Sequence, residues 1–197
     1  MNTLKAEKRS LDVKAKRLRR EGYVVGNVFG REMKESIPVK MVKRDVEKLL
    51  KTDHKGSQIM LDVDGQAYDV LIKEIQFNPL KGQVDEIDFQ ALVSNEKVHS
   101  VAEIVLVNHD KLEAGVLQQH LEEISFRALP SALVDKIMVD VGDMKVGDVI
   151  KVKDLAIAQD KDVDLKTDLE AAVVSVAAVH VDPALEAEEE AAAEELS

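Results

Sequence analysis

The clearest alternation of apolar and polar residues lies in IMLDVDGQAYDVLIK, residues 59–73. Apolar side chains occupy positions 59, 61 and 63 before Asp64-Gly65, and positions 68, 70 and 72 after it. A period of two is typical of strands that bury one face. Because Asp-Gly is a preferred two-residue turn, this segment predicts a β-hairpin.

The rest of the first 92 residues shows the same pattern in shorter runs. Strands are predicted at 23–30, 37–42, 74–78 and 83–92, the last two joined by a turn at Pro79 and Gly82. In the first of these runs Gly26 favours a bend or bulge. The pattern predicts an antiparallel sheet or a small barrel.

Two short helices interrupt this β pattern. Residues 14–21 are good helix formers and Gly22 is placed as a C-cap, while residues 44–51 have the apolar spacing of an amphipathic helix. The fold class is therefore mainly β: an N-terminal small antiparallel β-barrel with short helices, followed by a second β-rich domain.

The second domain is predicted to begin in the polar segment SNEKVHS, residues 94–100. Strands are expected at 102–107, at both ends of 136–155, and in the apolar run 171–181, which reads as a buried closing strand. We place the domains at 1–93 and 94–182. Residues 183–197 carry six Glu and no Lys or Arg, which favours an acidic, disordered tail.

Charge is unevenly distributed along this chain, whose net charge is -11. Residues 1–55 hold 16 Lys or Arg against 8 Asp or Glu, whereas residues 93–197 hold 9 against 23. The basic excess is densest in KAEKRSLDVKAKRLRREG, residues 5–22, with eight basic and three acidic side chains. Such asymmetry suggests that the basic end meets a polyanion.

The basic segment has two interpretations, and charge alone leaves both open. It can be an ordinary solvated helix face, or a nucleic-acid contact. Arg17, Arg19 and Arg20 favour the second, because the planar guanidinium suits bidentate phosphate binding. Nearby glycines and Phe29 would allow close approach and stacking.

The composition of the chain limits its possible chemistry and its location in the cell. The chain has no cysteine, which excludes disulfides, thiolate metal sites and cysteine nucleophiles and suits a reducing cytoplasm. Its N-terminus lacks the apolar region of a secretory signal, and its longest apolar run is shorter than the roughly 20 residues of a membrane helix. We expect a cytoplasmic protein without membrane contact.

No catalytic or metal-binding constellation is evident. The five histidines form no ligand pair, and His120 near Glu122 and Glu123 is best explained by chance. Asp62 and Asp64 lack the further acids of a calcium loop and are explained by the hairpin turn. We predict no enzyme activity, no metal and no cofactor.

Several motifs in order resemble one family. They are LKAEKR at residues 4–9, AKRLRREG at 15–22, NVFG at 27–30, VDG at 63–65 and KEIQFNPLKGQVDEIDF at 73–89. This succession resembles the bacterial large-subunit ribosomal proteins that bind 5S rRNA, in the two-domain form known as general stress protein Ctc. Residues 113–155 are similar to the C-terminal β domain of that form.

The resemblance implies a barrel that docks on 5S rRNA in the central protuberance of the large ribosomal subunit, with a C-terminal domain that adds little RNA affinity. It also implies a ribosomal location, contacts with neighbouring ribosomal proteins and a monomer off the ribosome. The RNA-facing residues carried over by position are Arg9, Lys14, Lys16, Arg19, Arg20, Phe29 and Asp88, with Lys73 and Gln76 as additions.

The chain departs from the family at three places. Phe29 stands where a tyrosine is usual, Phe77-Asn78 where Arg-His is common before the proline, and Glu86 where a histidine is common. A carboxylate near phosphates is repulsive where a histidine could donate a hydrogen bond, so we expect the same site with weaker affinity.

Two functions follow. The first is a structural ribosomal protein that binds 5S rRNA and supports translation. The alternative is a stress-linked ribosome-associated adaptor with weakened RNA binding, motivated by Glu86, Phe77 and Asn78 and by the acidic half. The sequence leaves open whether association with the ribosome is constitutive or stress-induced, and what the C-terminal domain contacts.

Overall fold

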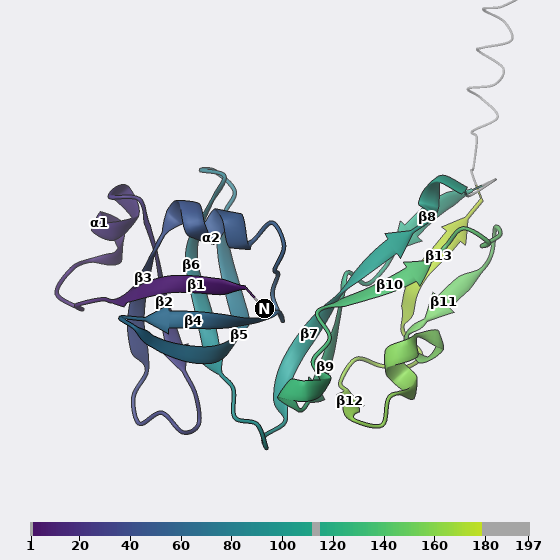
Figure 1. The fold of residues 1–197 in the computed structure, drawn as a ribbon. Helices are drawn as coiled ribbons and strands as arrows, with labels where there is room; N and C mark the ends of the chain where they lie inside the picture. The colour runs from purple at the N-terminus through teal and green to yellow at the C-terminus, as the bar shows by residue number, and fades with distance from the viewer. Residues whose placement is uncertain (1, 112–114, 179–197) are drawn as a thin grey trace, which may run out of the picture.

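A computed structural model describes residues 2–111 and 115–178. Its β-strands form two bodies that lie beside each other (Figure 1). The first, the barrel domain, is a closed six-stranded barrel with the strand order β1-β3-β2-β6-β5-β4. Its strands are β1 (Thr3–Lys8), β2 (Tyr23–Phe29), β3 (Ile37–Val42), β4 (Gln58–Val63), β5 (Gln66–Asn78) and β6 (Gln83–Ala91).

The ladders of this barrel are antiparallel with two exceptions. β1 pairs with β4 and β2 pairs with β6 in parallel. Consecutive strands joined by short turns must run antiparallel, but the pairs that close the barrel join strands far apart in the chain, where either direction is open. The predicted β4–β5 hairpin is present, and its turn residues Asp64 and Gly65 have φ angles of 52° and 88°.

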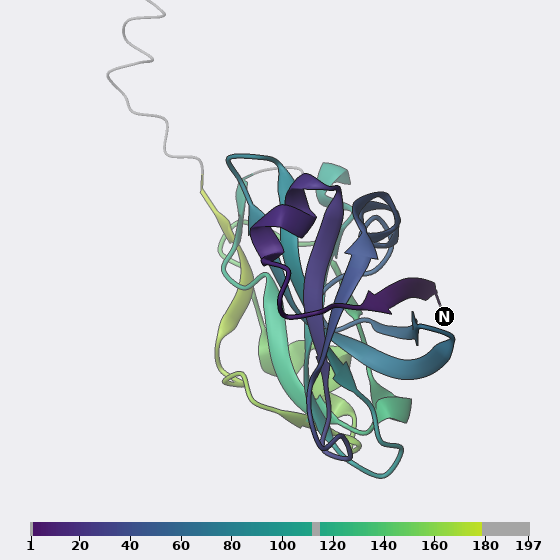
Figure 2. The ribbon, with the colours of Figure 1, turned by 90° about the vertical axis from the view of Figure 1, so that its left-hand side faces the viewer.

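Both predicted helices are present and hold different positions. Helix α1 (Ala15–Arg20) lies outside the barrel against β2, and Gly22 follows it. Helix α2 (Lys43–Leu49) contributes Val46 and Leu49 to the barrel core and contacts β1, β2 and β3. Figure 2 shows α1 on one side of the barrel and the N-terminus on the other.

Gly26 serves a purpose that differs from the predicted bend or bulge. The β2–β3 ladder runs through it in regular register. A Cβ at this position would lie 1.9 Å from the backbone oxygen of Ile87 in β6. The glycine therefore permits the close approach of two paired strands rather than a break in one of them.

The second domain contains two sheets. A four-stranded sheet has the order β10-β7-β9-β12 and a three-stranded sheet has the order β11-β13-β8. The strands are β7 (Val98–Val107), β8 (Val116–Gln119), β9 (Glu123–Ala128), β10 (Lys136–Asp140), β11 (Val149–Lys151), β12 (Val163–Leu165) and β13 (Ala172–Ala177). Within residues 97–111 and 115–178, the connections include four 3₁₀ turns: η1 (His109–Lys111), η2 (Pro130–Ala132), η3 (Val152–Asp154) and η4 (Ala156–Gln159).

Each domain has its own aliphatic core with one buried phenylalanine. Phe89 lies in the barrel core, and Phe126 lies in a core that draws residues from both sheets of the second domain. The mainly β fold with two domains is thus confirmed. Strand β13, predicted to be buried, occupies the centre of its sheet. The end of that predicted strand and the acidic tail lie outside the described residues.

The domains meet at a junction that belongs to neither core. Leu71 of β5 is buried there, together with Ser57 and Ser100. At Gly56, whose φ is 91°, a Cβ would lie 2.0 Å from the backbone oxygen of Val101. The two backbones can touch only because this position has no side chain.

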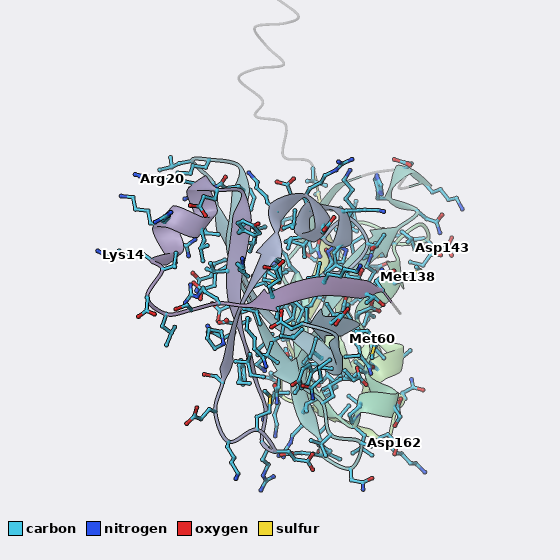
Figure 3. All side chains as sticks on the ribbon, turned by 60° about the vertical axis from the view of Figure 1, so that its left-hand side comes forward. Lys14, Arg20, Met60, Met138, Asp143 and Asp162 are labelled. Carbon is cyan, nitrogen blue, oxygen red and sulfur yellow. The ribbon has the colours of Figure 1, made fainter. Side chains whose placement is uncertain are left out.

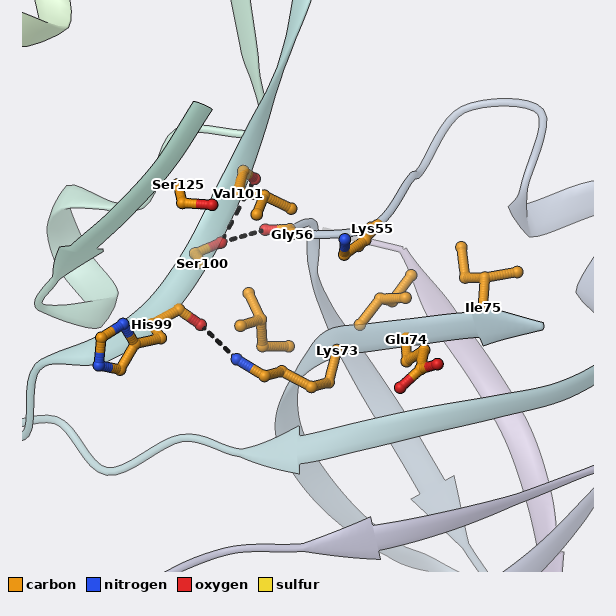
Figure 4. Close-up of a pocket in the computed structure, with 11 residues that line it drawn as sticks. Lys55, Gly56, Lys73, Glu74, Ile75, His99, Ser100, Val101 and Ser125 are labelled. Atoms are coloured by element: carbon orange, nitrogen blue, oxygen red, sulfur yellow. Dashed lines mark hydrogen bonds between the residues drawn. The ribbon is translucent and has the colours of Figure 1, made fainter. Parts of the chain in front are cut away.

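Polar contacts connect the two sides of the same junction (Figure 4). Ser100 Oγ donates to the Gly56 carbonyl oxygen at 3.4 Å, and Lys73 Nζ donates to the His99 carbonyl oxygen at 2.9 Å. Lys55 Nζ lies 3.1 Å from the Glu123 carboxylate. A pocket of about 580 Å³ remains between these groups. The second domain is therefore held in a defined orientation to the barrel.

Candidate nucleic-acid interface

Helix α1 presents its cations on the outside of the barrel. Leu18 is its buried residue, and Val25 is buried on the outer side of β2, which α1 contacts. With that face used for packing, Lys14, Lys16 and Arg20 are exposed and make no ion pair with any residue that the structure describes. Figure 3 shows Lys14 and Arg20 projecting from this side.

The parallel β2–β6 ladder brings the second part of the predicted site beside this helix. Asn27 pairs in register with Asp88, and Phe29 with Gln90. Because Val24 and Val28 point into the core, Asn27 and Phe29 point outward. We call this surface the α1 face. It consists of the exposed side of α1 and the outer sides of β2, β6 and the end of β5.

Strand β5 adds Gln76 to the α1 face. The β5–β6 ladder pairs Gln76 with Glu86 and Glu74 with Asp88. Between them, Ile75 packs against the core, so Gln76 and Glu74 have the outward orientation. Residues from four segments of the sequence thus share one surface.

Asp88 is partly engaged within the protein. Its Oδ1 accepts hydrogen bonds from the backbone N and the Nδ2 of Asn27, both at 3.1 Å. Two donors on one carboxylate oxygen fix the side chain and leave Oδ2 as an acceptor. Asn27 was not among the site residues predicted from the sequence, although its position two residues before Phe29 on an alternating strand could have indicated it.

Arg19 differs from the other cations of α1. Its Nε donates to the backbone oxygen of Asp85 at 2.9 Å, and its Nη2 lies 3.5 Å from Glu86 Oε2. Both side chains are about a quarter exposed. The contact ties α1 to β6 and gives the Glu86 carboxylate a positive partner.

Arg9 lies at the border of the α1 face. Its backbone N donates to the Pro38 carbonyl oxygen at 2.9 Å, and Pro38 pairs in register with Asn27 across β3 and β2. Arg9 Nε is buried without a hydrogen-bond partner, the one such side-chain atom among the described residues. A buried donor left unpaired costs roughly 1–3 kcal/mol, which a bound acceptor would recover.

Lys73 is not brought together with the other predicted residues. Its ammonium group donates a hydrogen bond to the His99 carbonyl oxygen at the domain junction. There burial, and then the nearby Lys55, lower the pKa of the Lys73 amine.

The end of β5 and the turn that follows it expose Phe77 and Leu80, and Asn78 Nδ2 donates to Asp85 at 3.1 Å. That bond is the main reason why the pKa of Asp85 is lowered.

The α1 face suits contact with RNA rather than catalysis. Exposed Lys and Arg can bind backbone phosphates, and Gln76, Asn27 and the free oxygen of Asp88 can meet base edges. The ring of Phe29, 37% exposed, offers a stacking surface.

Within residues 2–111 and 115–178, no group of three His, Cys, Asp or Glu could hold a metal ion. In the same ranges no helix has the length and apolar character to cross a membrane.

Comparison with protein families assigns both halves of the chain. Residues 4–89 match the model of the ribosomal L25p family, and residues 97–180 match that of the C-terminal domain of ribosomal protein TL5. The matched ranges correspond to the barrel domain and the second domain.

The chain is also similar to curated proteins named large ribosomal subunit protein bL25, and the similarity covers two thirds or more of each of them. The chain is 31% identical over 166 residues to large ribosomal subunit protein bL25 of Thermoanaerobacter sp. (strain X514), with 83% of this chain and 82% of that protein covered. The bL25 protein of Geobacillus thermodenitrificans is 35% identical, with coverages of 71% and 67%. That of Caldicellulosiruptor saccharolyticus is 28% identical, with coverages of 92% and 90%.

Proposed function

Because the chain belongs to the ribosomal L25p family, in its form with a TL5-type C-terminal domain, we propose that it is a structural protein of the large ribosomal subunit whose barrel binds 5S rRNA through the α1 face. The observation that supports this most is that the helix carrying Lys14, Lys16 and Arg20 packs against β2, the strand whose Asn27 is hydrogen-bonded to Asp88. The proposal divides the chain into an RNA-binding barrel at 1–93 and a second domain at 94–182.

The proposed division of roles follows from the side chains. Lys14, Lys16, Arg20 and the positive charge of Arg9 position the protein on the RNA backbone, a task that needs no base specificity. Gln76 and Asp88 read base edges that the irregular grooves of an RNA internal loop expose. Phe29 stacks on an unpaired base.

Glu86 is less of an obstacle than its charge implies. Its carboxylate lies against the Arg19 guanidinium, so the pair as a whole is neutral toward phosphates. The altered residues Phe77 and Asn78 lie at the β5–β6 turn, away from the Asn27–Asp88 pair. The adaptor alternative rested on these three residues and on the acidic half of the chain, and the ribosomal identity of the family does not favour it.

A gel-shift titration of the full chain with 5S rRNA, in the presence of excess transfer RNA, tests the proposal. The triple variant Lys14→Ala, Lys16→Ala, Arg20→Ala is expected to bind roughly 100-fold more weakly, at about 1 kcal/mol for each lost contact. The matched control replaces Lys136, Lys145 and Lys161 of the second domain, which make no ion pair with the described residues. Equal losses in both variants would overturn the proposal.

A further inference from the structure

We propose that the barrel carries a second RNA-backbone site, in the groove between β1 and α2, which takes a double-helical RNA segment other than the one on the α1 face. This inference rests on the proposed function in one respect, that the protein works in contact with RNA. It adds a second surface and makes the barrel a bridge between two RNA segments.

The groove has a volume of about 620 Å³, and side chains of the barrel core form its base. Leu4 of β1 and Leu49 of α2 line it from below, and both are buried in the barrel core. At its end, Asn2 Nδ2 donates to Asp53 Oδ2 at 2.6 Å and to Thr52 Oγ1 at 3.2 Å. These contacts join the start of β1 to the segment after α2, so the two walls keep a fixed separation.

Three lysines line the groove and are free for a ligand. Lys5 on β1, and Lys48 and Lys51 on the other wall, are exposed and form no ion pair within the part of the chain that the structure describes. Lys51 follows α2, and its backbone N donates to the Lys48 carbonyl oxygen at 3.4 Å, so the two residues lie in one turn. By contrast, Lys43 at the start of α2 is held by Gln83 and Glu47.

The acidic groups on and beside the groove form no ion pair with these lysines among the described residues. Asp45 lines the groove as its one carboxylate among the described lining residues. Asp53 is engaged by Asn2 and Thr52, and Asp62, which pairs in register with Lys5, accepts a hydrogen bond from Gly65 N at 2.8 Å. Asp53 and Asp62 are not part of the lining, and the described lining residues carry three lysines against one carboxylate, an excess of two positive charges.

The lining chemistry fits a nucleic-acid backbone better than a protein. Protein interfaces are centred on aromatic and Arg anchors, and the described lining residues include neither. Single-stranded RNA binds by stacking on aromatic rings, which are missing from the same lining. Lysine ammonium groups beside the hydroxyls of Thr3 and Thr52 remain suited to the phosphates and sugar hydroxyls of a duplex.

The position of the groove separates it from the α1 face. The N-terminal strand that forms one wall begins on the side of the barrel opposite α1 (Figure 2). An RNA segment in the groove would therefore not compete with one on the α1 face. The barrel can hold both at once.

The first test measures a ternary complex. The full chain is saturated with 5S rRNA, and a fluorescent 20-base-pair RNA duplex of unrelated sequence is titrated in at several salt concentrations. We expect the triple variant Lys5→Gln, Lys48→Gln, Lys51→Gln to bind 5S rRNA normally, but to bind the duplex on the order of tenfold more weakly with a salt slope lower by about 2–3. The variant Lys136→Gln, Lys145→Gln, Lys161→Gln should change neither.

The outcomes separate this inference from the proposed function. If the wild-type chain binds 5S rRNA and the groove variant binds the duplex as well as the wild type, the second site is wrong and the proposed function stands. The same conclusion follows if the duplex displaces 5S rRNA. If the wild-type chain fails to bind 5S rRNA, the proposed function is wrong.

The second test identifies what occupies the groove on the ribosome. Because the chain has no cysteine, Lys51→Cys can carry one light-activated crosslinker, with Lys16→Cys as a positive control on α1. After incorporation into large subunits and illumination, a crosslink from position 51 to RNA supports the inference. A crosslink to a ribosomal protein or to the acidic end of the same chain, or no crosslink while position 16 reacts, overturns it.

Discussion

Arg19 and Glu86 form an ion pair across 67 positions of sequence, with Nη2 and Oε2 3.5 Å apart. The same guanidinium bonds to the Asp85 backbone, so the contact fixes α1 on β6. An incoming phosphate must compete with the Glu86 carboxylate for the Arg19 guanidinium. We therefore expect this contact within the protein to influence how strongly the α1 face binds RNA.

Replacing Glu86 with glutamine should strengthen binding to 5S rRNA. The change releases Arg19 and removes a negative charge from the α1 face, and we expect a gain of about 0.5–1 kcal/mol, or two- to fivefold, at low salt. Filter binding measures it. The matched control is Glu123→Gln, which frees Lys55 from its 3.1 Å contact at the domain junction. Weaker binding by the Glu86 variant would show that Glu86 itself serves the RNA.

Two arginines of α1 should differ in their importance. Arg20 has no ion-pair partner among the described residues, whereas Arg17 Nε lies 2.9 Å from Glu21. Arg20→Ala should weaken RNA binding by about 1–3 kcal/mol and lower the salt slope by about 1. Arg17→Ala should cost less, since its charge is already compensated. Equal losses would contradict the assignment of Arg20 to the α1 face.

The domain junction should fail when Gly56 gains a side chain. A Cβ there would meet the Val101 oxygen at 2.0 Å, and the φ of 91° adds strain, so Gly56→Ala should cost on the order of 1–3 kcal/mol and release the second domain. Limited proteolysis should then cut faster within residues 92–98, with 5S rRNA binding unchanged. Gly65→Ala is the control, because its φ is 88° but its Cβ would touch nothing. Equal proteolysis of both variants would refute the role of Gly56.

Glu170 gives the second domain a pH-dependent contribution to stability. Hydrogen bonds from Lys151 and Lys153 lower the pKa of Glu170 from 4.5 to about 2. Because the folded pKa is the lower one, the stabilisation is complete above pH 4.5 and is lost as the pH falls toward 2. The contact is exposed, so salt should weaken it.

Thermal unfolding of the wild type and of Glu170→Gln measures this contribution. The difference in Tm should be constant above about pH 5 and shrink as the pH falls from 4.5 toward 2. Asp143→Asn, which removes a carboxylate without a side-chain hydrogen bond among the described residues, should show no such trend. A difference that is independent of pH would contradict the assigned contact.

Local features were predictable from the sequence, and long-range contacts were not. The Asp64-Gly65 hairpin and both helices follow from signals within about 15 residues, and the structure has them. The Asn27–Asp88 and Arg19–Glu86 contacts depend on the parallel β2–β6 pairing, which no local pattern specifies. For the same reason Lys73, a cation on a strand, could not be separated from the RNA-facing residues until its contact with His99 was seen.

The central claim is that the barrel, rather than the second domain, binds 5S rRNA. Each domain has its own core, so residues 1–92 and 93–197 can be prepared separately. The most direct measurement is a gel-shift titration of both fragments and of the full chain with 5S rRNA between 50 and 200 mM salt, a range over which affinity that depends on several phosphate contacts falls by roughly 10³-fold or more. The account predicts that residues 1–92 bind within about threefold of the full chain with the same salt slope. Equal or tighter binding by residues 93–197 would contradict it.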